Sequence, residues 1–328
     1  MFKKDPITII PYRGYQAASR LYVRGRVLED EVIEDQEDDR FLRTLWNNFR
    51  RFETDEIPNA QLRLSYLGQT FELTTDEEGF YELDVDLTNY KIEVPKLWHH
   101  SKIELLHAPG YTEQIVQAIG EVLTPNVDSE FGIISDIDDT ILQTHMTSFL
   151  KLKMLHQTFT QNSHTRSAME GIVEVYQQLA LGADGKGQNP FFYLSDSPWN
   201  LYDTINNFIA HQQLPAGPLF LRDFGFNRGE KRKLFKEHKQ INIKRILEAF
   251  PELPFILLGD TASHDADYYF EAIRKFPDRI KAVYIRQTKL NKNARRIREL
   301  QTQSGNTDFV IVENSAEILA DAKQRNLI

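Results

Sequence analysis

From Phe131 onward the sequence alternates between short apolar runs and longer segments with helical spacing. This alternation is typical of β-α units, in which a buried strand is followed by a helix that leads to the next parallel strand. The apolar runs are FGIIS (131–135), PFFYLS (190–195), PLFL (218–221), PFILLG (254–259), AVYI (282–285) and DFVIV (308–312). The pattern predicts an α/β domain with a Rossmann-like, doubly wound parallel sheet.

The first 125 residues have a different pattern, in which short strands are separated by turn signals. Apolar and polar residues alternate clearly over 62–66, as on a strand with one buried face. One exception is FLRTLWNNFRRF at 41–52, which has helical spacing. Because 328 residues exceed the usual size of one hydrophobic core, we expect two domains. These are an all-β, sandwich-like domain over 1–125 and the α/β domain over 126–328.

Composition and charge exclude several classes of protein. The chain has no cysteine, which excludes disulfides, thiolate catalysis and cysteine-bound metal centres. Its net charge of −9 argues against a general polyanion-binding surface, so we expect no nucleic-acid partner. No apolar stretch has the length of a membrane span, and the N-terminus has no apolar run of signal-peptide length. We expect a soluble, cytoplasmic protein.

Acidic residues follow the first apolar run of the α/β domain, where Asp136, Asp138 and Thr140 form a D-x-D-x-T pattern. Ligands of parallel sheets bind at the carboxyl ends of the strands. A carboxylate such as that of Asp136 can attack phosphorus when a metal ion neutralises the approaching charge. Asp138 can protonate the leaving oxygen and then deprotonate water. An acidic turn without catalytic role fits the pattern equally well.

Further polar residues follow later elements of the same domain. Ser195 ends the second apolar run, where its hydroxyl can help to bind phosphate or can cap a helix. Asp260 and Asp265 follow the run at 254–259, at a spacing that can complete an oxygen-ligand shell for Mg²⁺. A cation at a helix start could hold a phosphoryl group, and both Lys239 and Lys244 are candidates. Surface charge is the alternative for either lysine.

The order Asp, Ser, Lys, Asp along these elements resembles the four motifs of the haloacid-dehalogenase superfamily. The catalytic domain of the actin-patch-protein phosphatidate phosphatase family is a more specific resemblance, from Phe131 to Arg286. It is carried by YLSDSPWNLY (193–202), LPAGPLFLRDFG (214–225), HK (238–239) and FPELPFILLGDTASHDADYY (250–269), and PYRGY (11–15) fits the N-terminal region of bacterial members. Asp196 departs from the pattern, which has a neutral or small residue between the two serines.

This resemblance implies Mg²⁺-dependent hydrolysis of phosphatidate to diacylglycerol and phosphate, with residue roles carried over motif by motif. The implied nucleophile is Asp136 and the implied general acid and base is Asp138. The implied phosphate-binding residues are Ser195, Lys239 and Thr140. The implied metal ligands are Asp136, the Asp138 carbonyl, Asp260 and Asp265. Cleft positions are expected at Asn200, Arg222 and Asp223, although an ion pair between Arg222 and Asp223 is an alternative. Residues 141–190 are expected to form a small helical cap.

Two other functions remain open from the sequence alone. One is a soluble phosphomonoesterase acting on sugar phosphates or phosphoproteins, and the other is a non-catalytic adaptor with a degenerate hydrolase domain. Every acidic motif position is present, which favours an enzyme. The expected partners are a phospholipid or another phosphomonoester, and a membrane contacted peripherally. The segment 146–159 has the pattern of a membrane-surface helix, although packing against the catalytic domain is the stronger interpretation.

Overall fold

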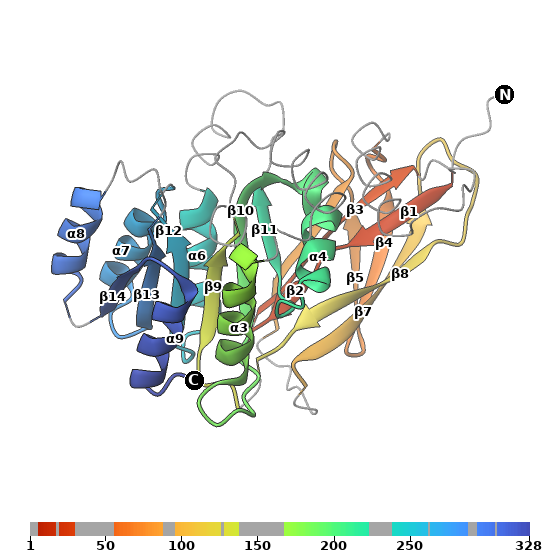
Figure 1. The fold of residues 1–328 in the computed structure, drawn as a ribbon. Helices are drawn as coiled ribbons and strands as arrows, with labels where there is room; N and C mark the ends of the chain where they lie inside the picture. The colour runs from red at the N-terminus through yellow and green to blue at the C-terminus, as the bar shows by residue number, and fades with distance from the viewer. Residues whose placement is uncertain are drawn as a thin grey trace. The chain divides into compact units, whose positions relative to one another are not determined.

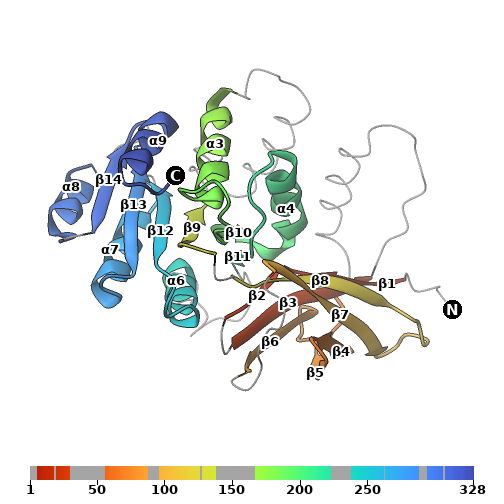
Figure 2. The same cartoon turned by 90° about the horizontal axis from the view of Figure 1, so that it is seen from below.

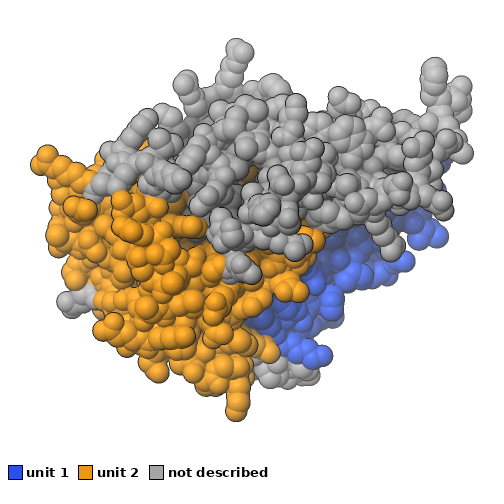
Figure 3. All heavy atoms as spheres, in the orientation of Figure 1, with its two compact units in different colours: residues 1–124, 200–204 blue, residues 125–199, 205–328 orange. Residues whose placement is uncertain are grey.

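The computed structural model describes residues 6–17, 20–29, 56–87, 96–125, 128–137, 167–222, 238–261, 263–287, 294–305 and 307–328. The chain divides into two compact units (Figure 3). Unit 1 comprises residues 1–124 and 200–204, and unit 2 comprises residues 125–199 and 205–328. The expected helix at 41–52 and the segment at 146–159 lie outside the described residues.

Unit 1 is a single, mainly antiparallel sheet, which in the described residues has eight strands (Figure 1). The strands are β1 (Ile7–Pro11), β2 (Gly14–Gln16), β3 (Arg20–Glu29), β4 (Gln61–Tyr66), β5 (Gln69–Thr74), β6 (Phe80–Asp86), β7 (Trp98–His107) and β8 (Gln117–Leu123). The order is β1-β3-β2-β8-β7-β4-β5, and β6 pairs with the other edge of β3. Strands β2 and β8 form a parallel pair.

The sheet of unit 1 curls around an apolar core. Strand β4 illustrates how one face of the sheet lines this core. Its Leu62, Leu64 and Tyr66 are buried while Gln61 and Arg63 are exposed, as the period-two alternation predicts. Strand β6 also approaches β5 from the other end of the sheet. An all-β arrangement is therefore confirmed for the described residues. Their strands are hydrogen-bonded into one continuous sheet instead of the two separate sheets of a sandwich, and β3 joins β1 and β2 on one edge to β6 on the other.

Unit 2 contains a sheet whose six described strands are all parallel. The strands are β9 (Gly132–Asp136), β10 (Phe191–Pro198), β11 (Leu219–Arg222), β12 (Phe255–Asp260), β13 (Ile280–Arg286) and β14 (Asp308–Val312). Each of the six apolar runs forms one of these strands, which confirms the predicted α/β fold with a parallel sheet. The runs are apolar throughout because strands such as β9 and β12 are buried at every position.

Helices cover both faces of the parallel sheet. The described helical segments are α3 (Ser167–Leu181), η2 (Trp199–Leu201), α4 (Tyr202–His211), α6 (His238–Ala249), α7 (Asp265–Lys275), α8 (Ala294–Gln303) and α9 (Ser315–Gln324). Helices α3 and α9 lie side by side on one face, and α6 and α7 on the other (Figure 2). Helix α3 belongs to the segment 141–190 that was expected to form a cap, and it buries Val175, Tyr176 and Leu179. Residues 141–166 lie outside the described residues.

The strand order β11-β10-β9-β12-β13-β14 reverses direction next to β9. The chain first adds β10 and β11 on one side of β9, and then adds β12, β13 and β14 on the other. Side chains that follow β9 and β12 therefore lie at the topological switch point, which is where open parallel sheets bind ligands. None of the helices in the described part of the chain is both long and apolar enough to span a membrane.

Candidate active site

Two neighbouring strands of the parallel sheet end in an aspartate. Asp136 is the last residue of β9 and Asp260 the last residue of β12. The two strands are in register, with Ser135 opposite Leu258. Both aspartates are buried, Asp136 being 0% and Asp260 1% exposed. The sheet itself therefore brings two carboxylates together at its carboxyl edge.

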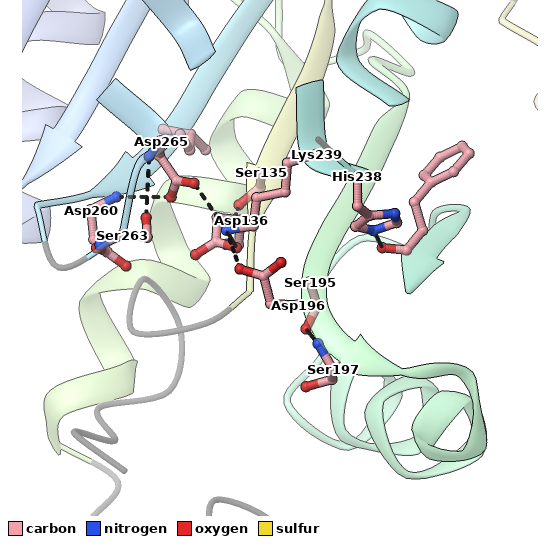
Figure 4. A network of polar contacts seen from close by, with 12 residues as sticks. Ser135, Asp136, Ser195, Asp196, Ser197, His238, Lys239, Asp260, Ser263 and Asp265 are labelled. Atoms are coloured by element: carbon pink, nitrogen blue, oxygen red, sulfur yellow. Dashed lines mark hydrogen bonds and ion pairs between the residues drawn. The ribbon is translucent and has the colours of Figure 1, made fainter. Parts of the chain in front are cut away.

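A third carboxylate comes from the first residue of α7. Asp265 is fully buried, and its Oδ2 accepts a hydrogen bond from the Asp260 N–H at 3.4 Å. The turn between β12 and α7 is closed by Ser263, whose N–H donates to Asp260 Oδ1 at 2.9 Å and whose Oγ accepts from the Asp265 N–H at 3.3 Å (Figure 4). A Cβ atom at Gly259 would lie 2.8 Å from Asp265 Cβ. Glycine at this position is what allows Asp265 to approach the strand so closely.

Lys239, the second residue of α6, lies among these acids and is 3% exposed. Its Nζ donates to Asp136 Oδ1 at 2.6 Å and to Asp265 Oδ1 at 2.9 Å. Lys244, the competing candidate, is exposed on the same helix and pairs with Glu248 at 3.5 Å. The structure thus places Lys239 at the acidic cluster and Lys244 at the surface.

The three buried acids have the composition of a site for a hard divalent cation. One carboxylate oxygen from each of Asp136, Asp260 and Asp265 lies within 4.8 Å of the other two. Three carboxylates and the Lys239 ammonium carry formal charges of −3 and +1, a net of −2. Burying uncompensated charge is costly, and a divalent cation would balance it. Carboxylate oxygens are also the donors that Mg²⁺ prefers, so the cluster could bind such an ion.

Strand β10 contributes Ser195, which is fully buried and whose Oγ accepts a hydrogen bond from the Ser197 N–H at 3.0 Å. The next residue, Asp196, has a side chain that is 46% exposed and that lies near two cations. Asp196 Oδ2 is 3.9 Å from Lys239 Nζ, and Asp196 Oδ1 is 3.7 Å from Nη2 of Arg222, the last residue of β11. The carboxylate points toward Lys239 and Asp136 (Figure 4). Arg222 is therefore part of the same charged network.

The remaining predicted site residues are either assigned to unit 1 or not described, and their expected roles stay predictions. Asn200 groups with unit 1, where its Oδ1 accepts a hydrogen bond from Arg26 Nη1 at 3.3 Å. Asp138, Thr140 and Asp223 lie outside the described residues. Their expected roles as general acid and base, phosphate contact and cleft residue stay predictions.

His238, the first residue of the HK pair in the family resemblance, was given no role from the sequence. His238 Nε2 is 3.2 Å from the Phe220 carbonyl oxygen, and its Nδ1 is 3.1 Å from Asn242 Nδ2. These partners fit a neutral ring, with Nε2–H donating and Nδ1 accepting. Burial, chiefly, lowers the pKa of His238 below its ordinary value. The ring links β11 to the start of α6 and so supports the neighbouring Lys239. The i, i+4 spacing of His238 and Asn242 on one helix is the sequence feature that could have indicated their contact.

A buried pair also supports the backbone at the end of β9. The Tyr176 hydroxyl of α3 lies 2.5 Å from Ser135 Oγ, which in turn donates to the Asp136 carbonyl oxygen at 3.0 Å. Burial raises the pKa of Tyr176, so the hydroxyl stays protonated and can donate to Ser135. Nothing in the local sequence connects residues 41 positions apart, which is why pattern reasoning missed this contact.

One family model matches the segment of the sequence that contains the acidic cluster. Residues 131–287 match the family described as phosphatidate phosphatase APP1, catalytic domain. The chain is 30% identical over 239 residues to phosphatidate phosphatase APP1 of Saccharomyces cerevisiae, which covers 72% of this chain and 39% of the yeast protein. An uncharacterized protein of Schizosaccharomyces pombe is 25% identical over 219 residues, or 66% of this chain and 34% of that protein. The chain thus spans well under half the length of these curated relatives.

Solved structures resemble the chain only remotely. A carbohydrate acetylesterase from Xanthomonas citri is 11% identical, covering 95% of this chain and 72% of that protein, with a TM-score of 0.29. A similarity of this size supports no conclusion about fold or activity. The relation to known proteins therefore rests on sequence, and the family match covers the segment that contains the acidic cluster.

Proposed function

Because residues 131–287 belong to the family of phosphatidate phosphatase APP1 catalytic domains, we propose that this chain is a phosphatidate phosphatase. The proposed reaction converts phosphatidate to diacylglycerol and phosphate, with Mg²⁺ as cofactor and an aspartyl-phosphate intermediate. The observation that carries the proposal is the buried cluster of Asp136, Asp260 and Asp265 around Lys239 at the switch point of the sheet. A phosphatidate phosphatase acts on a membrane lipid, so we also propose peripheral contact with a membrane.

We propose that unit 2 has the haloacid-dehalogenase type of fold, with Asp136 as the nucleophile. A carboxylate oxygen of Asp136 attacks the phosphorus as the bond to the diacylglycerol oxygen breaks, and that oxygen takes a proton from Asp138. Water then attacks the same phosphorus, gives its proton to Asp138 and releases Asp136. Lys239 Nζ, 2.6 Å from Asp136 Oδ1, holds the carboxylate ionised and oriented. The role of Asp138 rests on the D-x-D-x-T pattern.

Binding the phosphoryl group is mainly an electrostatic task. Lys239 and the Ser195 hydroxyl would contact its oxygens, since both lie at the carboxyl edge of the sheet beside Asp136. Asp136, Asp260 and Asp265 would hold Mg²⁺, with the Asp138 carbonyl as a further ligand. When bound, Mg²⁺ would supply positive charge that screens the nucleophile from the phosphate. Burial of all three acids keeps water from weakening these interactions.

The test is phosphate release from phosphatidate in mixed micelles, with and without Mg²⁺, for the wild type and for Asp136→Asn. The exchange keeps the side-chain shape but removes the nucleophilic charge, so we expect activity to fall on the order of 10³-fold or more. Asp278→Asn is the matched control, because Asp278 is exposed in a turn with φ of 66°, which asparagine tolerates. This control should keep full activity.

Each outcome of the assay has a definite meaning. Cleavage of a soluble aryl phosphate with phosphatidate left intact would refute the lipid substrate and favour a soluble phosphomonoesterase. Absence of turnover on both substrates, with Mg²⁺ present, would favour the non-catalytic adaptor. Full activity of Asp136→Asn would refute Asp136 as the nucleophile whichever substrate is cleaved.

A further inference from the structure

The carboxylate of Asp196 lies between two cations that come from different elements. Its Oδ2 faces Lys239 Nζ at 3.9 Å, and its Oδ1 faces Arg222 Nη2 at 3.7 Å. Both distances exceed those of hydrogen bonds. The side chain of Asp196 is 46% exposed, whereas that of Lys239 is 3% exposed. Pairs of this length and exposure are weak, so these two ion pairs oppose displacement of Asp196 by another anion only weakly.

In the described part of the chain, two titratable side chains near Asp196, those of Tyr268 and His238, carry no charge. Burial raises the pKa of Tyr268 on α7, and the charge of Asp196 adds to that effect, so Tyr268 is neutral. His238 is also neutral, because burial lowers its pKa. Among the charged side chains that the structure describes, Lys239 and Arg222 are the cations that face Asp196, beside the acids that Lys239 contacts. A phosphate has more charge and more oxygens than a carboxylate and can contact both cations.

We propose that Asp196 is an exchangeable counter-ion, and that phosphate displaces it from Lys239 and Arg222 when it binds. Arg222 is then a second phosphate-binding cation, with a planar guanidinium suited to two oxygens of one phosphate. When the reaction ends, the carboxylate returns to the cations and promotes release of the product phosphate. This inference rests on the proposed phosphatase function and adds to it a determinant of phosphate affinity.

Removing the charge of Asp196 should therefore strengthen phosphate binding. In Asp196→Asn we expect the dissociation constant for inorganic phosphate to fall about five-fold, since an exposed ion pair that opposes binding is lost. KM for a soluble aryl phosphate should fall by a similar factor, while kcat does not rise. Asp196→Glu, which keeps the charge, should bind phosphate as weakly as the wild type. Asp278→Asn removes one charge from unit 2 in the turn before β13 and should change nothing.

The experiment is calorimetric titration of inorganic phosphate into the full chain with Mg²⁺, at constant low ionic strength. Arg222→Gln should weaken phosphate binding, and Asp196→Asn should tighten it less than two-fold in that background. The proposal would be overturned if Asp196→Asn bound phosphate no more tightly than the wild type. It would also be overturned if Asp196→Asn increased phosphate affinity as much in the Arg222→Gln background as in the wild type. Thermal unfolding checks that each variant is folded. Because no lipid is used, tighter binding in Asp196→Asn supports the exchange even if phosphatidate is not hydrolysed.

Discussion

Replacing Lys239 by methionine keeps an unbranched side chain in the cluster but removes its ammonium group. The Nζ atom contacts both Asp136 and Asp265, and all three side chains are buried. After the exchange, three carboxylates face one another without this compensating charge. Removing one partner from a buried ion pair typically costs about 3–5 kcal/mol. For a domain of about 200 residues each kcal/mol shifts Tm by about 2–4 °C, so Tm should fall by roughly 6–20 °C in metal-free buffer.

Added Mg²⁺ should recover part of this loss. Lys239 contacts oxygens of Asp136 and Asp265, and a divalent cation in this cluster would bind the same two carboxylates, so the variant would lack a competitor for the ion. A ligand that binds only the folded state stabilises it by RT ln(1 + L/Kd), where L is the free ligand concentration, so tighter binding gives a larger gain in stability. Mg²⁺ should therefore raise the Tm of Lys239→Met by more degrees than that of the wild type.

Scanning calorimetry with a chelator and then with Mg²⁺ measures both effects. Lys244→Met is the matched control on the same helix, because Lys244 is 57% exposed and its pair with Glu248 is of the i, i+4 kind. Such a pair contributes about 0.3–0.5 kcal/mol, so Tm should hardly move. Equal shifts for the two variants, or an Mg²⁺ effect no larger in Lys239→Met than in the wild type, would refute the electrostatic argument.

Two further predictions concern groups that support the site. In Gly259→Ala the new Cβ would lie 2.8 Å from atoms of both Asp265 and Tyr269. We therefore expect the free energy of unfolding to fall by about 1–3 kcal/mol and calorimetric titration to show weaker Mg²⁺ binding. Undiminished Mg²⁺ affinity would contradict the role of this glycine. Burial lowers the pKa of His238 in the folded state, so as pH falls the unfolded state takes up this proton at a higher pH than the folded state does. The folded state therefore loses stability as pH falls below about 6.5, the ordinary pKa of histidine. In His238→Gln, urea unfolding at a series of pH values should show a smaller decline below that pH, and an unchanged decline would rule out this account.

The parallel sheet was predictable because its strands are buried on both faces. Runs such as FGIIS and PFILLG are apolar without interruption, so each appears in the sequence as one segment. Strand β8 has no clear alternation in the sequence, because the apolar Ile119 is exposed and the buried position 120 is a glycine. Strand β2 has three residues, too few to show a period. Long buried strands are thus readable from one sequence, whereas short or half-exposed strands depend on their partners.

The site was predictable where one residue directly follows an apolar run. Asp136 and Asp260 each end such a run, and the rule that parallel sheets bind ligands at their carboxyl edge brings them together. The choice between Lys239 and Lys244 could not be made from the sequence, since both lie on one helix and burial separates them. The contact between Tyr176 and Ser135 was equally hidden, because it depends on the packing of α3 against the sheet.

The pairing of β9 with β12 has a consequence for ion size. Asp136 and Asp260 end adjacent strands, whose separation of about 4.8 Å is set by backbone hydrogen bonds. Both strands are completely buried, so the backbone spacing of the two aspartates is fixed by the ladder, and their carboxylates can adjust only by rotation about side-chain bonds. Mg²⁺ has ligand distances of about 2.0–2.1 Å, whereas Ca²⁺ needs about 2.3–2.6 Å and more ligands. A stiff sheet edge of this kind should therefore discriminate against the larger ion through the backbone itself.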